Sequence, residues 1–240
     1  MTRRSLTAVL VLVAAVGGCS TSSGPDGAED PGHPDIPGLV VFYQFDGDLQ
    51  NEVADEHHLT SGRAVTYIAD HNGTPDSAVH VAGDTLWVSD HPDLDVTGAI
   101  TLAAWVRPDI SNHCYAAVID KNYDEAYSLG MHGAADPDTV HIRAYLTDVD
   151  FHTGDMVPMG TSTWSHIAFT FDEGTDEARF YFNGSCVETL VSPVAIGTCD
   201  KNLRIGRAYY GDRYSGGVDQ AAVFDRALTP AEVHALYGFD

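Results

Sequence analysis

The sequence predicts an all-β domain, a β-sandwich closed by one short C-terminal helix. Short apolar segments recur along the chain with turn signals about every dozen residues, the spacing expected of strands in a sandwich. The 23 glycines favour such a turn-rich architecture. No helical periodicity precedes Thr229, and 240 residues is a length that one such domain with its tails can fill.

The candidate strands follow one another in short, separate segments. The segment 99–106 is apolar on both faces and is therefore expected in the middle of a covered sheet, ended by Pro108. Asn183 and Gly184 form a dipeptide typical of a tight hairpin. The remaining candidate strands are 39–45, 78–81, 85–88, 116–119, 126–131, 140–146, 166–171, 178–182 and 203–206.

The chain closes with a strand, a turn and a capped helix. Residues 218–224 alternate with the period of a strand. Thr229 is a good N-cap, Pro230 suits the first helical position, and Glu232 completes a capping box. A helix of about two turns is not stable alone, so we expect it to pack on the sandwich as a lid.

Three of the strands separate polar from apolar faces. In 140–146, 166–171 and 178–182, apolar residues occupy alternate positions that are expected to point inward. If these strands are neighbours, one outward face carries six side chains: His141, Arg143, Tyr145, His166, Arg179 and Tyr181. Aromatic rings beside polar groups that fix hydroxyls are typical of sugar sites. The alternative is half-buried sheet residues, with the tyrosines packing and the arginines paired to aspartates.

The N-terminus reads as an export signal. Arg3 and Arg4 precede an apolar segment, 6–16, that is too short to span a bilayer comfortably. The sequence Val-Gly-Gly-Cys that follows resembles a bacterial lipobox, which implies that residues 1–18 are removed and that Cys19 is acylated. The alternative is an ordinary signal peptide with a chance cysteine.

A polar tether separates this signal from the domain. Residues 19–38 are rich in Ser, Gly, Pro and Asp and are expected to form a flexible linker, followed by a domain over 39–238. We therefore expect a protein of the cell envelope that is held by its lipid anchor and faces outside the cytoplasm.

Export permits disulfides, and three cysteines remain besides Cys19. Cys186 and Cys199 flank a segment that can double back, so we favour this pair over a pairing of either with Cys114. One thiol is then left free or paired elsewhere. No Cys-x-x-Cys occurs, which argues against a cysteine metal site.

The chain is strongly acidic, with a formal net charge of -23. Removal of the signal takes away Arg3 and Arg4 and leaves about -25. Such a chain repels nucleic acid and anionic lipid headgroups, so no nucleic-acid partner is expected and only the lipid reaches the membrane. The acidity suits a protein that binds cations or neutral ligands, or it only keeps an exported protein soluble.

Seven short motifs follow one another along the predicted domain. They are Tyr43–Asp46, Gly83–Asp84, Ile100–Pro108, Trp164–Ala168, Phe180–Gly184, Leu203–Gly206 and Gly217–Glu232. In this order they resemble the LamG-like jelly rolls of the concanavalin A-like lectin/glucanase superfamily. The resemblance implies a jelly roll of two antiparallel sheets. It implies less about activity, because the fold carries many functions.

The resemblance also implies a Ca²⁺ site. Asp84 and Asp219 match positions that the family often uses for side-chain ligands, and Asp55 lies in the loop that the family uses. Asp46 offers a further hard oxygen of the kind that Ca²⁺ prefers. The loop after Asp55 reads Glu-His-His-Leu where the family has small glycine and asparagine residues, which departs from the pattern. The alternative for each aspartate is a turn residue that caps backbone amides.

No catalytic pattern stands out. The chain lacks the closely spaced carboxylates that glycoside hydrolysis needs on one strand, and it has no Gly-x-Ser-x-Gly or His-Glu-x-x-His. His57 and His58 suggest either a transition-metal site or two solvated loop histidines. We expect a non-catalytic surface module that binds a glycan, assisted by Ca²⁺. The alternative is an interaction or structural module for an envelope or extracellular protein, and an enzyme is the third interpretation.

Overall fold

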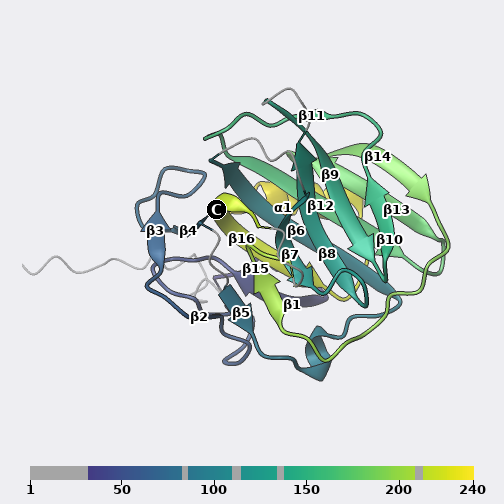
Figure 1. Cartoon of the computed structure of the whole chain (residues 1–240), viewed down its shortest axis with the longest axis horizontal. Helices are drawn as coiled ribbons and strands as arrows, with labels where there is room; N and C mark the ends of the chain where they lie inside the picture. Colours follow the sequence, from purple (N-terminus) through teal and green to yellow (C-terminus); the bar gives the residue numbers. More distant parts are fainter. Residues whose placement is uncertain (1–31, 83–85, 110–114, 134–137, 209–212) are drawn as a thin grey trace, which may run out of the picture. The chain divides into compact units, whose positions relative to one another are not determined.

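Two antiparallel β-sheets face each other in the computed structural model (Figure 1). The structure describes residues 32–82, 86–109, 115–133, 138–208 and 213–240. Over these residues the predicted β-sandwich is confirmed, with strands throughout and a single α-helix at the C-terminus. In the described part of the chain, no helix has the length and apolar character to span a membrane.

The first sheet contains the strand that the sequence places in the middle of a covered layer. Its strand order is β14-β13-β12-β6-β16-β4-β3, and β1 also pairs with β16. The strands are β1 Leu39–Tyr43, β3 Thr66–Ile68, β4 Ala78–Ala82, β6 Ala99–Pro108, β12 Ser165–Asp172, β13 Glu177–Phe182, β14 Ser185–Val191 and β16 Ser215–Phe224. β6 is central and buried over nearly its whole length, as its two apolar faces predict.

The second sheet has the order β10-β9-β8-β7-β15-β5-β2, with β11 paired to β9. Its strands are β2 Thr60–Ser61, β5 Leu86–Val88, β7 Tyr115–Lys121, β8 Tyr127–Gly133, β9 Thr139–Leu146, β10 Val149–His152, β11 Val157–Pro158 and β15 Leu203–Ile205. β9 alternates strictly between buried and half-buried residues, so one of its faces points to the core and the other points outward.

The core lies between the two sheets and is built from the alternate positions of both. Ile167 and Phe169 of β12 belong to the same buried cluster as Leu129 of β8 and Ile142 of β9. Each of these four side chains is fully buried. At about 25 cal/mol per Å² of apolar area removed from water, this shared core is the main term that holds the sheets together.

The tight hairpin predicted at Asn183 and Gly184 joins β13 to β14. Both residues have positive φ, 47° and 73°, as a type I′ turn requires. The register places Phe182 opposite Ser185, so the two strands are joined by these two residues alone. β14 continues to Val191 as the outermost strand of the first sheet.

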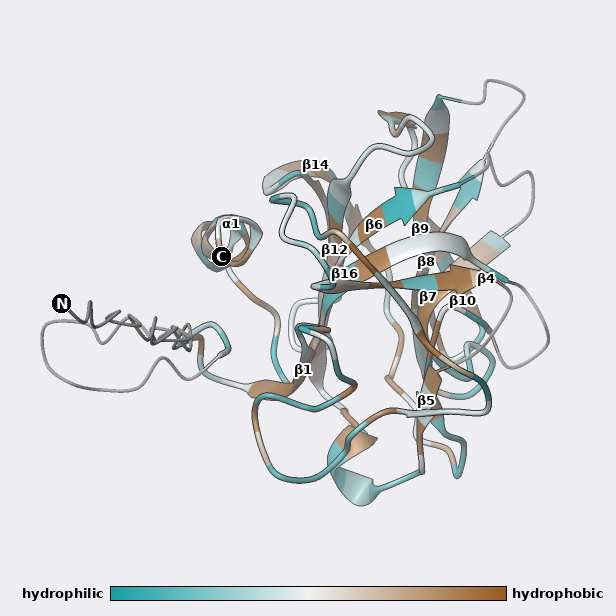
Figure 2. Ribbon diagram, turned by 90° about the vertical axis from the view of Figure 1, so that its left-hand side faces the viewer, coloured by the Kyte–Doolittle hydropathy of each residue, from teal (hydrophilic) through white to brown (hydrophobic). Residues whose placement is uncertain are grey.

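Helix α1, Pro230–Tyr237, lies outside the first sheet (Figure 2). Its predicted cap is present: the Thr229 side chain accepts from the Glu232 backbone, and the Glu232 carboxylate accepts from the Thr229 N–H at 2.8 Å. Val233 and Leu236 of the helix form one buried cluster with the outward side chains of the sheet, including Phe42 and Phe224. The helix therefore covers the outer face of this sheet, as expected of a lid.

Candidate functional site

The outer face of the second sheet gathers polar and aromatic side chains from neighbouring strands. On β9, the half-buried positions are His141, Arg143 and Tyr145. The register sets His132 of β8 opposite His141, so both side chains lie on this face. β10 pairs with β9 on the side away from β8, and its register adds residues of β10 to the same outer face.

A cavity of about 170 Å³ opens on this face. It is lined by His132, His141, Arg143, Asp150 and His152. Asp150 lies opposite Tyr145 and His152 opposite Arg143 in the pairing of β10 with β9. Five polar residues from three adjacent strands thus converge on one hollow, and polar groups of this kind are the ones that fix the orientation of a ligand in a binding site.

The polar groups of this cavity are held in fixed orientations. Arg143 Nε donates to Asp150 Oδ1 at 2.7 Å, and its Nη2 donates to the other carboxylate oxygen. These hydrogen bonds raise the pKa of the Arg143 guanidinium, so it stays charged. His141 Nδ1 lies 2.7 Å from the Thr153 carbonyl, which can only accept, so Nδ1 carries the proton and Nε2 is left as an acceptor.

Three tyrosines stand beside the cavity. The Tyr145 ring lies 5.2 Å from Tyr115 and 5.1 Å from Tyr123 between centroids. The Arg143 guanidinium sits 5.0 Å from the Tyr145 ring centre and 5.7 Å from that of Tyr115, within cation–π range. Gly130 makes room, because a Cβ there would stand 2.9 Å from the Tyr115 ring. Tyr115 is itself buried, whereas Tyr123 and Tyr145 are half-buried and present aromatic surface next to the charged Arg143.

A second hollow opens further along the same sheet. It encloses about 350 Å³ and is lined by Trp87, Asn202, Arg204 and Arg207. Trp87 of β5 is paired with Arg204 of β15, and Arg204 with Asp120 of β7. The sequence prediction missed these residues, as well as Tyr115, His132 and Asp150. Trp87 lies in the candidate strand 85–88 and Arg204 in the candidate strand 203–206, where alternation was the signal that would have shown them. Tyr115 and His132 each lie one residue beyond the candidate strands 116–119 and 126–131.

The prediction that six side chains share one face is wrong. His141, Arg143 and Tyr145 belong to the second sheet, whereas His166, Arg179 and Tyr181 belong to β12 and β13 of the first. The residue period shows which side of a strand a side chain takes, but it does not show which sheet the strand joins.

The outward positions of the first sheet are also not exposed. Tyr181 is fully buried in the cluster beneath helix α1, and His166 is only 1% exposed. Arg179 forms an ion pair with Glu177 on its own strand. Neither Tyr181 nor His166 can therefore meet a soluble ligand, and the reason is the lid that packs on this face.

His166 sits in a buried aromatic group. Its ring lies 5.5 Å from that of Trp105 and 5.9 Å from that of Tyr237, both edge to face. Burial lowers the pKa of His166 to about 3, with a smaller contribution from His71, so the imidazole is neutral at physiological pH. Its Nδ1 has no hydrogen-bond partner among the described residues.

Asp219 lies on the same outer face, at an irregularity in β16. The pairing with β6 shifts between Asp219 and Ala222, and Gln220 has φ 46°, so one extra residue is inserted there as a β-bulge. The Asp219 Oδ2 lies 2.8 Å from His71 Nδ1, and the His71 ring stacks 4.1 Å from Trp105. Burial raises the pKa of Asp219 to about 6, against the opposing effect of the hydrogen bond with His71.

This region offers oxygen atoms for a cation. Asp70, His71 and Asp219 bring one potential ligand atom each within 4.8 Å of one another. Asp219 Oδ1 and Gln220 Oε1 are buried and have no hydrogen-bond partner in the described part of the chain. Orphaned buried oxygens of this kind fit a hard cation such as Ca²⁺, which takes carboxylate and amide oxygens.

Of the four predicted calcium ligands, the three that the structure describes, Asp46, Asp55 and Asp219, do not form one group. Asp55 instead lies 3.4 Å from His58, and Asp46 is exposed after β1. Within the described residues, neither joins a group of three or more potential metal ligands. Asp84 lies outside the described residues, as does the lipidation residue Cys19.

The predicted disulfide between Cys186 and Cys199 is not formed; both thiols are free. Cys186 is the second residue of β14 at the edge of the first sheet, where its Sγ lies 3.5 Å from the Glu188 carbonyl. Cys199 follows the crossing to the second sheet, where its Sγ lies 3.3 Å from the Lys121 carbonyl. The segment between them does not double back, because β14 runs on along the edge before the chain changes sheets. Cys114 lies outside the described residues.

A sandwich of two antiparallel sheets, with one face under a helix and the other open to ligands, defines a lectin-like β-sandwich domain. The profile of the concanavalin A-like lectin/glucanases superfamily matches residues 52–234. The chain belongs to this superfamily. Among curated proteins, no sequence matches it significantly.

Solved structures with low sequence identity share the fold. Domain 4 of an extracellular arabinanase from Geobacillus stearothermophilus, solved in complex with arabinotriose, is 18% identical with a TM-score of 0.67, over 83% of this chain and 98% of that one. The binding domain of Paraclostridial mosquitocidal protein 1 is 12% identical with a TM-score of 0.65. A binding domain of botulinum neurotoxin DC, in complex with SialylT, is 11% identical with a TM-score of 0.61. The alignments cover 83% and 84% of this chain and 52% and 51% of those two chains, about half of each.

Proposed function

We propose that this protein is a non-catalytic binding module that holds a glycan on the outer face of the second sheet. The observation that carries the proposal is the cavity of about 170 Å³ lined by Arg143, Asp150 and three histidines, beside the Tyr145 ring. A pyranose or furanose presents C–H groups to an aromatic ring and hydroxyls to polar groups, and this face supplies both. The related arabinanase domain, solved with arabinotriose, supports the same chemistry.

The charges of the cavity favour a neutral sugar. Arg143 is already neutralised by two hydrogen bonds to Asp150, so neither group is free to hold a carboxylate or a sialic acid by charge alone. The pair can still donate hydrogen bonds to hydroxyls and accept hydrogen bonds from them at its edges, and His141 Nε2 can accept one. The chain as a whole is acidic, with a net charge of -23, which also disfavours an anionic ligand.

The same cavity supports binding without catalysis. Of its lining residues, only Asp150 carries a carboxylate, and Arg143 occupies both of its oxygens. Glycoside hydrolysis ordinarily requires two carboxyl groups on opposite sides of the bond. The proposal is therefore a lectin-like role, with no bond made or broken.

The test compares arginines that have matched surroundings on the two sheets. Arg143 pairs with Asp150 at the cavity, and Arg179 pairs with Glu177 on the first sheet. On an array of neutral oligosaccharides, including arabino-oligosaccharides, we expect saturable binding by the wild type that falls at least about 10-fold in Arg143→Gln and in Tyr145→Ala. Arg179→Gln is expected to bind like the wild type. Binding that survives both cavity substitutions would overturn the proposed site.

A second candidate function is docking of an envelope or extracellular protein. The observation that favours it is β14, the outermost strand of the first sheet, where Val187 and Val191 are 43% and 73% exposed. An edge strand with free backbone groups and apolar side chains is a common docking surface for a peptide strand. This function would be favoured over the first if the wild type binds no glycan on the array but captures an envelope protein that Val191→Lys does not capture.

We also propose that Ca²⁺ binds at Asp219. The support is the buried Oδ1 of Asp219 and the Oε1 of Gln220, which have no partner among the described residues, near the Asp70 carboxylate. A cation there would be bound by both oxygens, which would then have a partner, and it would shape the neighbouring loops. We expect added Ca²⁺ to raise the melting temperature of the wild type and to leave that of Asp219→Asn unchanged. No shift in the wild type would overturn the site.

We finally propose that the protein is anchored to a membrane of the cell envelope through lipid on Cys19 and faces outside the cytoplasm. The support is the lipobox-like sequence and the polar tether that follows it. Membrane fractions are expected to retain the wild type and to lose Cys19→Ser. Equal retention of both proteins would contradict the lipid anchor.

A further inference from the structure

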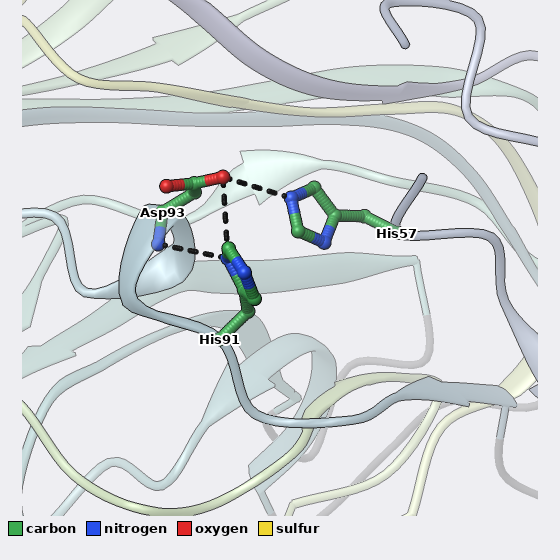
Figure 3. A group of neighbouring side chains, drawn as sticks. All are labelled: His57, His91 and Asp93. Atoms are coloured by element: carbon green, nitrogen blue, oxygen red, sulfur yellow. Dashed lines mark hydrogen bonds and ion pairs between the residues drawn. The ribbon is translucent and has the colours of Figure 1, made fainter. Parts of the chain in front are cut away.

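Two loops that are distant in sequence bring two imidazoles and a carboxylate together (Figure 3). His57 Nε2 lies 3.2 Å from Asp93 Oδ2, and His91 Nδ1 lies 3.2 Å from the same oxygen. The two imidazole rings are 4.7 Å apart between centroids. Glu56 adds a second carboxylate, 4.0 Å from His57 Nε2.

We propose that His57, His91 and Asp93 bind a divalent transition-metal ion, of which Zn²⁺ fits the donor set best. Bonds of about 2.0–2.1 Å from a tetrahedral zinc ion put neighbouring ligand atoms about 3.3 Å apart. The two contacts to Asp93 Oδ2, at 3.2 Å each, match that edge. Glu56 or water would complete the coordination.

The donors select the class of ion. Imidazole nitrogen suits zinc and other first-row transition metals, whereas Ca²⁺ takes oxygen ligands almost exclusively. The site is thus distinct from the oxygen-rich surroundings of Asp219, and it does not depend on the proposed glycan binding. The strongly acidic chain raises the local concentration of any cation near its surface.

The loops are held in place by bonds that do not involve the three ligands' own side chains. The Tyr43 hydroxyl donates to the His57 carbonyl at 2.8 Å, and the Asn51 amide donates to the Glu56 carbonyl at 3.0 Å. His57 itself has φ 61°, a strained conformation that aims its ring at the second loop. His58, its neighbour, turns away and accepts from the Asn51 N–H.

The second loop is equally fixed. Asp93 lies in the short 3₁₀ helix Pro92–Leu94, and the Tyr127 hydroxyl donates to the Leu94 carbonyl at 2.9 Å. Lys121 Nζ contacts Asp90 and Asp95 on either side of this helix, at 2.6 and 2.9 Å. The ligands are therefore held close together before an ion arrives, which lowers the entropic cost of binding.

The cluster is also accessible from solvent. The His57 side chain is only 8% exposed, but those of His91 and Asp93 are 46% and 54% exposed, so an ion can enter from solvent. The single lone pair of His91 Nδ1 accepts from the Asp93 N–H across a long 3.3 Å, so an ion that binds at Nδ1 displaces only this weak hydrogen bond.

The test uses the full-length protein, purified without a histidine tag and titrated with Co²⁺, whose visible absorption reports four-coordinate nitrogen and oxygen ligation. We expect one Co²⁺ per chain, displaced by Zn²⁺ and not by Ca²⁺. His57→Asn removes the imidazole and keeps a residue that tolerates positive φ. It is expected to weaken Co²⁺ binding by more than about 10-fold, as is Asp93→Asn.

The matched control is His80→Asn. His80 Nε2 lies 2.7 Å from Asp109 Oδ2, so the control removes another histidine that contacts a carboxylate, away from the cluster. It is expected to bind Co²⁺ like the wild type. Absence of a saturable site in the wild type would overturn the proposal, as would equal losses in His80→Asn and His57→Asn. Melting curves in chelator establish that each variant is folded, so that a loss of binding reports the ligands.

Discussion

At the scale of single residues, exposure separates histidines that look alike in the sequence. His141 and His166 both occupy polar positions in strands with alternating faces. His141 is half-buried at a cavity, whereas His166 is 1% exposed beneath a helix. The alternation predicts the side of the strand correctly for each. It carries no information about what packs on that side, because the covering element is distant in sequence.

The burial of His166 leads to a prediction about acid stability. An unfolded histidine titrates near pH 6.5, but burial lowers the native pKa of His166 to about 3. Between these values the unfolded state binds a proton that the native state does not. The contribution of His166 to the free energy of unfolding therefore falls as pH falls, by roughly 1.4 kcal/mol per pH unit. His166→Phe, which keeps an aromatic ring beside Trp105, removes this term.

The quantity to measure is the difference in the free energy of unfolding between the wild type and His166→Phe. Asp219 has a native pKa raised to about 6, so its own contribution to the free energy of unfolding rises as pH falls from about 6 to the ordinary pKa of an aspartate. In that pH range it offsets the contribution of His166 in the wild type. The measurement is urea unfolding at several pH values between about 6.5 and 4. As pH falls, the free energy of unfolding of His166→Phe is expected to rise relative to that of the wild type by roughly 1.4 kcal/mol per pH unit. His152→Gln, at the cavity on the other sheet, serves as control. Parallel pH profiles for wild type and His166→Phe would contradict the assignment.

At the scale of elements, helix α1 shows how local signals specify a structure that only tertiary packing stabilises. The capping box, the proline at the start and the short apolar pattern were all visible in the sequence, and the helix begins where they predict. Its partner was not visible in detail. Val233 and Leu236 pack on Phe42, which lies almost two hundred residues earlier, and this contact gives the helix its role as a lid.

The cap leads to a prediction about this element. Thr229→Ala leaves the Glu232 N–H without its side-chain acceptor and is expected to lower the free energy of unfolding by about 1 kcal/mol. Thr229→Ser keeps the acceptor and is expected to retain most of that stability. Both are measured by urea unfolding of the purified protein. If serine costs as much as alanine, the threonine methyl group rather than the cap is what the helix needs.

At the scale of the whole molecule, the two sheets have different outer faces. The first is covered by α1, which Figure 2 shows outside that sheet. The second bears the cavity. The order of seven motifs was enough to predict the sandwich, because each motif reports a local strand or turn. The assignment of strands to sheets was not predictable, because β9 and β12 alternate in the same way yet lie in opposite layers. The same limit explains the wrong disulfide, since it required a reversal that the change of sheet prevents.

This difference between the two outer faces predicts different effects when two tyrosines with the same sequence pattern are truncated to alanine. Tyr181 is fully buried between the first sheet and α1, so Tyr181→Ala removes a packed ring and is expected to cost about 3–5 kcal/mol of unfolding free energy. Tyr145 is half-buried at the cavity, so Tyr145→Ala is expected to cost about 1 kcal/mol or less, while it weakens glycan binding. Urea unfolding and glycan titration of both variants test the pair. Because the folded fraction of Tyr181→Ala retains the whole cavity, its affinity per folded molecule should equal that of the wild type. Equal stability losses in the two variants would mean that α1 does not cover the first sheet in solution.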